Sequence, residues 1–178
     1  MEPKPKSLNG NALTYGAITA GAMIVYSLIL FILNLYLNKP LGYVNYLMMI
    51  GGMVLGTLQY RKSVDRGILP YGKAFSSCFM IGLVASVISI IYFFIYIKFI
   101  NTGMIPEMIE QARQQMMDKA NGMSEDQIDK AMEYTAKFMQ PGWMMVFGLL
   151  MYVIISAVFA AILGIILKKE DNSINSIA

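Results

Sequence analysis

Few residues in this sequence are of the types that carry metal or acid–base chemistry. It contains no histidine and a single cysteine, Cys78. Histidine and cysteine are the usual ligands of zinc, haem iron and iron–sulfur clusters, and histidine is the usual base of a catalytic triad. One cysteine cannot form an intrachain disulfide, and no group near Cys78 in the sequence would activate its thiol. We therefore expect no enzymatic activity, no catalytic residue, no metal site and no cofactor.

The 16 methionines offer one metal alternative, because thioethers are soft ligands that suit copper(I). Five of them lie in the most polar part of the chain: Met104, Met108, Met116, Met117 and Met123. Methionine is also a good helix former and an adaptable apolar filler, and copper sites usually add cysteine or histidine. The pattern therefore favours packing over metal binding.

Long apolar segments dominate the rest of the sequence. Hydrophobic residues make up 57% of the chain and charged residues 14%, whereas soluble domains carry about 25% charged residues. Apolar runs of 18 or more residues are typical of membrane-spanning helices. The sequence predicts an all-α integral membrane protein with spans at about 12–37, 43–60, 74–99 and 143–167. The first could instead be a signal peptide, but it is long for one and no cleavage site follows, so we expect an anchor.

The only long polar segment, residues 100–142, lies between the third and fourth spans. Asn121 and Gly122 stop a first helix, and Ser124 with Gln127 forms a capping-box pattern that starts a second. Each helix carries several charges and is too short to cross a bilayer. The segment therefore predicts an extramembrane amphipathic helical hairpin.

Basic residues are distributed unevenly across the predicted topology. Of the 14, eight fall on the side that holds the two tails (1–11 and 168–178) and the loop between the second and third spans. Cytoplasmic loops carry an excess of lysine and arginine, so both termini are expected in the cytoplasm and residues 100–142 on the opposite side. The residues expected to fix this topology, or to touch lipid head groups, are Arg61, Lys62, Arg66, Lys73, Lys168 and Lys169.

Small residues spaced four apart mark candidate helix-packing sites within the spans. They are Ala17, Gly21, Gly52, Gly56, Gly82, Ser86, Ser156, Ala160 and Gly164. Such stripes let helix backbones approach closely, either inside one bundle or against a partner or second copy. No acid or base lies in the middle of a span, and ion-coupled transporters generally need one.

Several segments from Arg61 onward form a recognisable order: Gly67–Phe75, Tyr96–Asn101, Met123–Ile128 and the closing pair Lys168–Lys169. In these segments the sequence resembles domain-of-unknown-function family 4199. The likeness covers about 100 residues and leaves out the first two spans, which are generic. The resemblance implies a four-helix bacterial membrane protein of the kind found mainly in Bacteroidota. It implies no activity, so no catalytic residue is carried over.

These observations favour a non-enzymatic structural or accessory protein of the bacterial inner membrane that presents a periplasmic helical hairpin. The alternative is a small transporter or channel subunit, and an intramembrane enzyme is a more distant third. Expected partners are the lipid bilayer and a second membrane protein or another copy of the chain. The net charge of +3 is modest and indicates no nucleic-acid partner.

Overall fold

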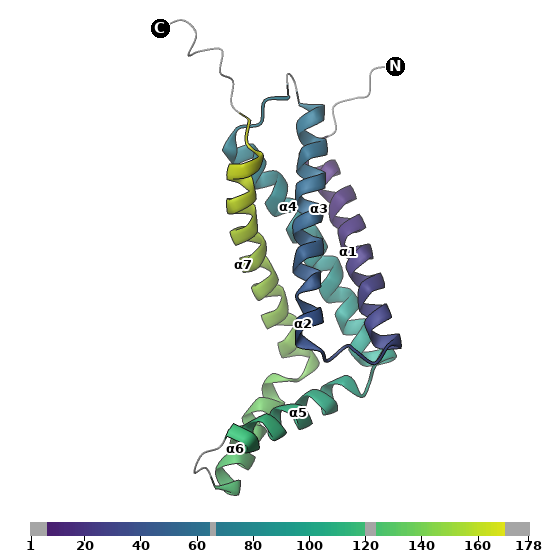
Figure 1. The fold of residues 1–178 in the computed structure, drawn as a ribbon, viewed down its shortest axis with the longest axis vertical. Coiled ribbons are helices and arrows are strands. Elements are labelled where there is room, and N and C mark those ends of the chain that lie inside the picture. Colours follow the sequence, from purple (N-terminus) through teal and green to yellow (C-terminus); the bar gives the residue numbers. More distant parts are fainter. Residues whose placement is uncertain (1–6, 65–66, 120–123, 170–178) are drawn as a thin grey trace, which may run out of the picture. The chain divides into compact units, whose positions relative to one another are not determined.

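The structure, a computed structural model, describes residues 7–64, 67–119 and 124–169. Within these residues the chain is helical apart from turns and one isolated pairing of two extended residues (Figure 1). The helices form two compact units. Unit 1 runs up to Ser89 and resumes at Met151, and unit 2 comprises Ile90–Leu150. The elements are α1 (Leu8–Ile32), α2 (Lys39–Gly42), α3 (Val44–Ser63), α4 (Tyr71–Ile95), a π-helical turn (Tyr96–Ile100), α5 (Met104–Lys119), α6 (Glu125–Phe138) and α7 (Pro141–Leu167).

Among the described residues, four helical stretches are long and apolar enough to cross a membrane: Leu8–Ile32, Lys39–Ser63, Tyr71–Ile100 and Pro141–Leu167. The prediction of an all-α chain with four such helices is therefore confirmed. Their sides that face away from the protein carry large exposed apolar residues, including Leu13, Leu55 and Ile166. Exposing such apolar surfaces to water would be costly, whereas apolar side chains are expected where a helix contacts the hydrocarbon chains of lipids.

The first helix lies about four residues earlier than the predicted 12–37. It begins at Leu8, because the Ser7 hydroxyl accepts a hydrogen bond from the Gly10 N–H (3.1 Å) and caps the helix. It ends at Ile32, and Asn34 adopts a left-handed conformation (φ 54°) in the turn that follows. The segment 33–37 is therefore apolar but not part of the helix.

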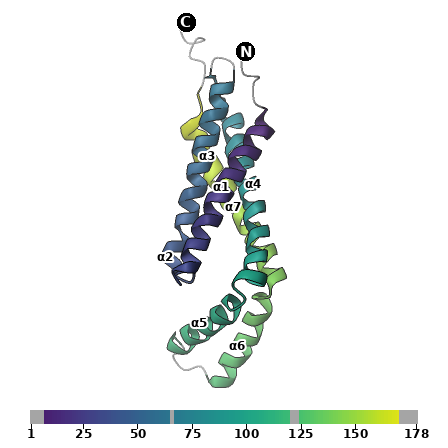
Figure 2. The ribbon, with the colours of Figure 1, turned by 90° about the vertical axis from the view of Figure 1, so that its right-hand side faces the viewer.

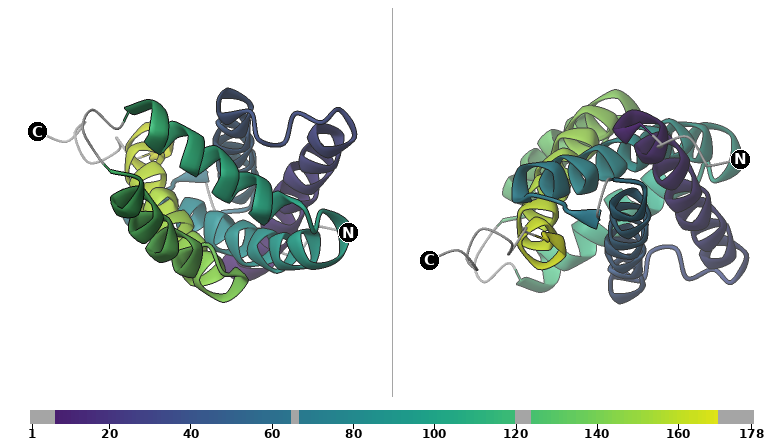
Figure 3. Two further views of the ribbon diagram at one scale, coloured as in Figure 1. Left: turned by 90° about the horizontal axis from the view of Figure 1, so that it is seen from below. Right: turned by 90° about the horizontal axis from the view of Figure 1, so that it is seen from above.

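Unit 1 is a bundle of α1, α3, the first part of α4 and the last part of α7, which lie side by side (Figures 1 and 2). Figure 3 shows the same segments end-on. The side chains in the core include Met49 and Met53 from α3, Cys78 and Ile81 from α4, and Ala160 from α7. Helices α1 and α3 contact each other.

Unit 2 contains the last part of α4, the π-helical turn, α5, α6 and the first part of α7. The prediction continued the third span as regular helix to Phe99, but its last turn widens, because the Asn101 N–H reaches back five residues to the Tyr96 carbonyl (2.7 Å). The Asn101 side chain donates to the Tyr96 hydroxyl (3.1 Å). The predicted start of α6 is confirmed, since the Ser124 N–H donates to Gln127 Oε1 (3.1 Å).

Candidate functional site

Two glycines of α3 lie where neighbouring helices of unit 1 approach closely. A Cβ added at Gly52 would overlap the side chain of Thr19 on α1. One added at Gly56 would lie 2.7 Å from Tyr15 Cβ and 2.5 Å from Ile81 Cδ1. Both positions were predicted as packing sites, and the structure brings both into the contact between α1 and α3.

The predicted packing residues of α4 and α7 also lie inside unit 1. A Cβ at Gly82 would come within 3.0 Å of Ser156, whose side chain is buried. Ser86 is buried, and its hydroxyl donates a hydrogen bond to the Gly82 carbonyl of its own helix (2.7 Å), so the buried hydroxyl has a partner within α4. Ala160 is buried, and a Cβ at Gly164 would lie 3.2 Å from the backbone nitrogen of Phe75. These residues bring α4 and α7 together.

Ala17 and Gly21 are the exception among the predicted packing residues. Ala17 is exposed, and a Cβ at Gly21 would meet nothing within 4 Å. The buried side of α1 is instead the one that carries Gly16 and Ala20. A Cβ added at Gly16 would lie 2.6 Å from Val84 Cβ. Because α1 is apolar around most of its circumference, residue types alone did not fix which side faces the bundle.

A group of neutral polar side chains from α1, α3 and α4 is buried in unit 1. Asn11 of α1 is fully buried, and its amide nitrogen donates to the Gly56 carbonyl of α3 (2.8 Å). The Thr57 hydroxyl of α3 donates to the Ser77 hydroxyl of α4 (3.0 Å) and lies 3.2 Å from the Cys78 sulfur. In the described part of the chain no group hydrogen-bonds to Asn11 Oδ1. These bonds tie α1, α3 and α4 together where a bilayer would offer no water.

The sequence signal for this cluster was weak. Asn11 falls in the predicted N-terminal tail, and neither Thr57 nor Ser77 stands out by residue type. Cys78 draws attention only as a thiol that has no activating group near it in the sequence. Their shared neighbourhood depends on how the three helices are rotated, which the sequence does not state.

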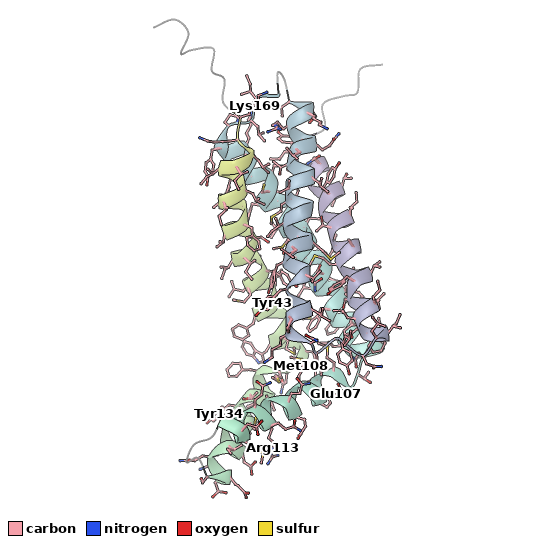
Figure 4. All side chains as sticks on the ribbon, in the orientation of Figure 1. Tyr43, Glu107, Met108, Arg113, Tyr134 and Lys169 are labelled. Carbon is pink, nitrogen blue, oxygen red and sulfur yellow. The ribbon has the colours of Figure 1, made fainter. Side chains whose placement is uncertain are left out.

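The basic end of unit 1 is joined by backbone and side-chain bonds. The amide and carbonyl of Leu69 pair with those of Lys169, both at 2.8 Å. Arg61 Nη1 donates to the carbonyl of Leu167 (3.4 Å), which places a positive charge at the C-terminal end of α7. Lys62, Lys73 and Lys168 are exposed, as is Lys169 (labelled in Figure 4), and Arg66 lies outside the described residues. The predicted head-group residues that can be seen thus share one end of the unit.

Helices α5 and α6 of unit 2 contact each other and are joined by an ion pair. Arg113 Nη2 of α5 lies 2.7 Å from Asp129 Oδ1 of α6 (Arg113 is labelled in Figure 4). Both side chains are about half exposed, so the pair stabilises the contact by less than about 1 kcal/mol. Ile128 and Met132 of α6 are buried.

One carboxyl group on α6 has a perturbed acidity. Lys137 Nζ lies 2.9 Å from Glu133 Oε1, and its hydrogen bond and positive charge lower the pKa of Glu133. The group is fully exposed, so this interaction is screened by water and marks no reactive site.

The structure does not gather metal ligands in the residues it describes. No three acidic or cysteine side chains there lie close enough together to hold a metal ion. Of the methionines considered for copper(I), Met104, Met108 and Met116 are half-buried and Met117 is exposed, while Met123 lies outside the described residues. The half-buried positions suit methionine as an apolar filler of a helix contact.

The fold and the buried polar bonds define an all-α protein with four helices suited to a membrane. The sequence model of the family described as "Protein of unknown function (DUF4199)" matches residues 14–169. The chain therefore belongs to this family, and the match extends the resemblance back through the first two spans. No curated protein and no solved structure matches the chain.

Proposed function

We propose that the chain is a non-enzymatic structural or accessory protein of the bacterial inner membrane, and that α5 and α6 form an extramembrane hairpin displayed to a partner protein. The arrangement of charge on this pair carries the proposal. Ile128 and Met132 are buried, whereas the acidic residues of both helices are exposed. An exposed charged surface held by an ion pair suits recognition of another protein more than crossing a bilayer.

The proposed direction places both termini in the cytoplasm and residues 100–142 in the periplasm. It is supported by the basic end of unit 1, where Arg61 and Lys169 are bonded to neighbouring segments and Lys62, Lys73 and Lys168 are exposed. Positive charges of this kind are retained on the cytoplasmic side.

Photo-crosslinking in native membranes tests the partner role. A photoreactive amino acid is placed at Gln111 on α5 or at Asp126 on α6, both of which are exposed. The matched control is Gly72, an exposed position at the basic end where a side chain would meet nothing within 4 Å. We expect the same adduct from Gln111 and Asp126 and not from Gly72. Adducts to lipid alone from all three positions would contradict the partner role.

A second function, that of a small transporter or channel subunit, is favoured by one observation. The buried Asn11 and the Thr57–Ser77 bond place neutral polar groups between helices where apolar side chains would pack. Such groups can contact a solute or ion inside a membrane.

Ion flux through reconstituted liposomes tests this alternative. The variant Thr57→Val removes the buried hydroxyl without a large change in size. The control Thr14→Val removes an exposed hydroxyl that bonds only to the Gly10 carbonyl of its own helix. Flux of sodium, potassium or protons that is lost in the first variant and kept in the second would support transport, and no flux from the unaltered protein would count against it.

A further inference from the structure

The C-terminal end of α6 carries exposed aromatic rings that continue onto α7. Tyr134 is 65% exposed and Phe138 57%, although both lie on a helix that buries other apolar residues. The ring centroid of Phe138 lies 6.4 Å from that of Trp143 and 6.2 Å from that of Phe147, both in edge-on geometry. Trp143 and Phe147 are also exposed, so these three rings form one continuous surface. Tyr134 lies one helical turn before Phe138 on the same side of α6, and the four residues are here called the aromatic surface. All of it belongs to unit 2.

The length of α7 indicates the depth of this surface in a bilayer. The helix has 27 residues, which is about 40 Å at ~1.5 Å per residue. About 20 residues cross the ~30 Å hydrocarbon core, and about 40–45 Å includes both head-group layers. Counting about 20 residues back from Leu167, where the basic end begins, reaches Gly148. Trp143 and Phe147 therefore fall in the opposite head-group layer, and Phe138, which touches both, falls there too.

Helix α6 carries apolar, aromatic, basic and acidic residues on different sides, and this arrangement fits a helix that lies in the head-group layer. Residues three, four and seven apart share a side of a helix. Ile128 and Met132 face inward, Tyr134 and Phe138 occupy the next side, and Lys130 and Lys137 flank these rings. Lys137 Nζ lies 5.6 Å from the centroid of the Tyr134 ring, labelled in Figure 4. The acids Asp126, Asp129 and Glu133 lie on the remaining side, beyond the lysines.

We infer that α6 is an interfacial helix, whose aromatic surface inserts into the head-group layer of the bilayer that α7 enters. Aromatic rings are favoured at this layer, and lysine side chains beside them reach lipid phosphates. The acidic side then faces water, which keeps like charges away from an anionic membrane. The inference rests on α7 crossing the membrane and not on the partner role proposed for the hairpin.

The natural sequence supplies the means to test this, because Trp143 is its only tryptophan. The purified full-length protein is reconstituted into phosphatidylcholine vesicles. Tryptophan fluorescence is then quenched by lipids brominated near the ester groups, by lipids brominated near the chain ends, or by iodide in the water. In a Trp143→Phe background, single reporters are introduced as Phe138→Trp and Tyr134→Trp. The control is Glu133→Trp, one residue from Tyr134 on the acidic side.

The expected result is that Phe138→Trp and Tyr134→Trp, like native Trp143, emit at shorter wavelength and are quenched mainly by the shallow brominated lipid. Glu133→Trp is expected to be quenched mainly by iodide. Quenching of Phe138→Trp by iodide and not by lipid would overturn the inference. So would shielding that disappears when the protein is diluted in lipid, because the surface would then be covered by a second copy. Neither outcome bears on the photo-crosslinks from Gln111 and Asp126.

The lysines provide a separate arm of the test. Adding phosphatidylglycerol should increase the protection of Phe138→Trp from acrylamide, a neutral quencher that an anionic surface does not repel, and the changes Lys130→Gln and Lys137→Gln together should remove that increase. Protection that does not respond to phosphatidylglycerol in either protein would contradict the contact between these lysines and lipid phosphates.

Discussion

The contact between α1 and α3 makes a sharp prediction, because two adjacent glycines of α3 have opposite surroundings. A methyl group at Gly52 overlaps Thr19, whereas one at Gly51 meets nothing within 4 Å. Thr19 is β-branched and its hydroxyl already donates to the Tyr15 carbonyl (2.7 Å), so it cannot simply rotate away. Overpacking of this kind costs about 1–3 kcal/mol. We expect Gly52→Ala to weaken the bundle by that amount and Gly51→Ala to leave it unchanged or slightly more stable.

The assay uses Cys78, the only cysteine, as a native reporter of bundle opening. Its side chain is fully buried in the core of unit 1, so a maleimide dye reaches it only when the bundle opens. In detergent micelles at constant temperature, a loss of about 1–3 kcal/mol raises the open population, and hence the labelling rate, roughly 5–150-fold. Gly51→Ala should label no faster than the unaltered protein.

A second substitution checks that the overlap is the cause. Thr19→Gly removes the three side-chain atoms that lie nearest to the new methyl group at Gly52. In a double-mutant cycle, the cost of Gly52→Ala should shrink markedly when Thr19→Gly is already present. Equal labelling of Gly52→Ala and Gly51→Ala would refute the reasoning, and so would a cost that is unaffected by the change at Thr19.

Three further predictions follow from bonds seen in the structure. Arg61→Met removes the guanidinium from the Leu167 carbonyl, and should speed Cys78 labelling by an amount equivalent to less than about 1 kcal/mol, because the bond is long and only partly buried. Thr57→Val should cost about 1 kcal/mol in the same assay, since it leaves a buried hydroxyl on α4 without its donor. Lys137→Gln should raise the pKa of Glu133 toward its ordinary value, measured by NMR titration of the carboxyl carbon. The pair with Lys137 is formed above the ordinary carboxyl pKa and lost as the pH falls through the lowered one. An unchanged titration would show that the pair is absent in solution.

The number of membrane-type helices could be predicted from the sequence because it depends on composition over long windows. Four charge-poor stretches bounded by Lys39, Arg61 and Lys168 leave little choice of helix number. Local signals were also sufficient at the start of α6, where Ser124 and Gln127 make the predicted bond. The end of α1 was harder to predict, because Leu33–Leu37 carries no charge and continues the apolar run, whereas the helix ends at Ile32 and Asn34 is left-handed in the turn that follows.

Rotation of each helix about its axis was less predictable. A small residue indicates a close approach but not its direction, and Ala17 lies one position from Gly16, which makes the actual contact. In soluble helices the polar side resolves this ambiguity, whereas a helix between lipid and bundle is apolar on both sides. The buried bond between Asn11 and Gly56 depends on the same rotation, so sequence reasoning missed it.

The aromatic surface could be predicted only in part from the sequence. Aromatic residues gather at membrane interfaces, and Trp143 stands at the start of the predicted fourth span, where such an interface is expected. That Phe138 on α6 joins them depends on the turn between Phe138 and Pro141, which brings the two helices into ring contact. Side-chain geometry was needed to connect the amphipathic helix to the membrane.

The most direct test of the proposed architecture is the side of the membrane on which each segment can be labelled. Gln111→Cys on α5 and Gly72→Cys at the basic end are both exposed positions, and native Cys78 is buried and gives little background. A membrane-impermeant maleimide is applied to cells whose outer membrane has been made permeable and whose inner membrane is intact. Under these conditions we predict that Gln111→Cys is labelled at once. Gly72→Cys should be labelled only after the inner membrane is opened. Labelling of both from the same side, or of Gly72→Cys alone, would contradict the four-span topology with cytoplasmic termini and a periplasmic hairpin.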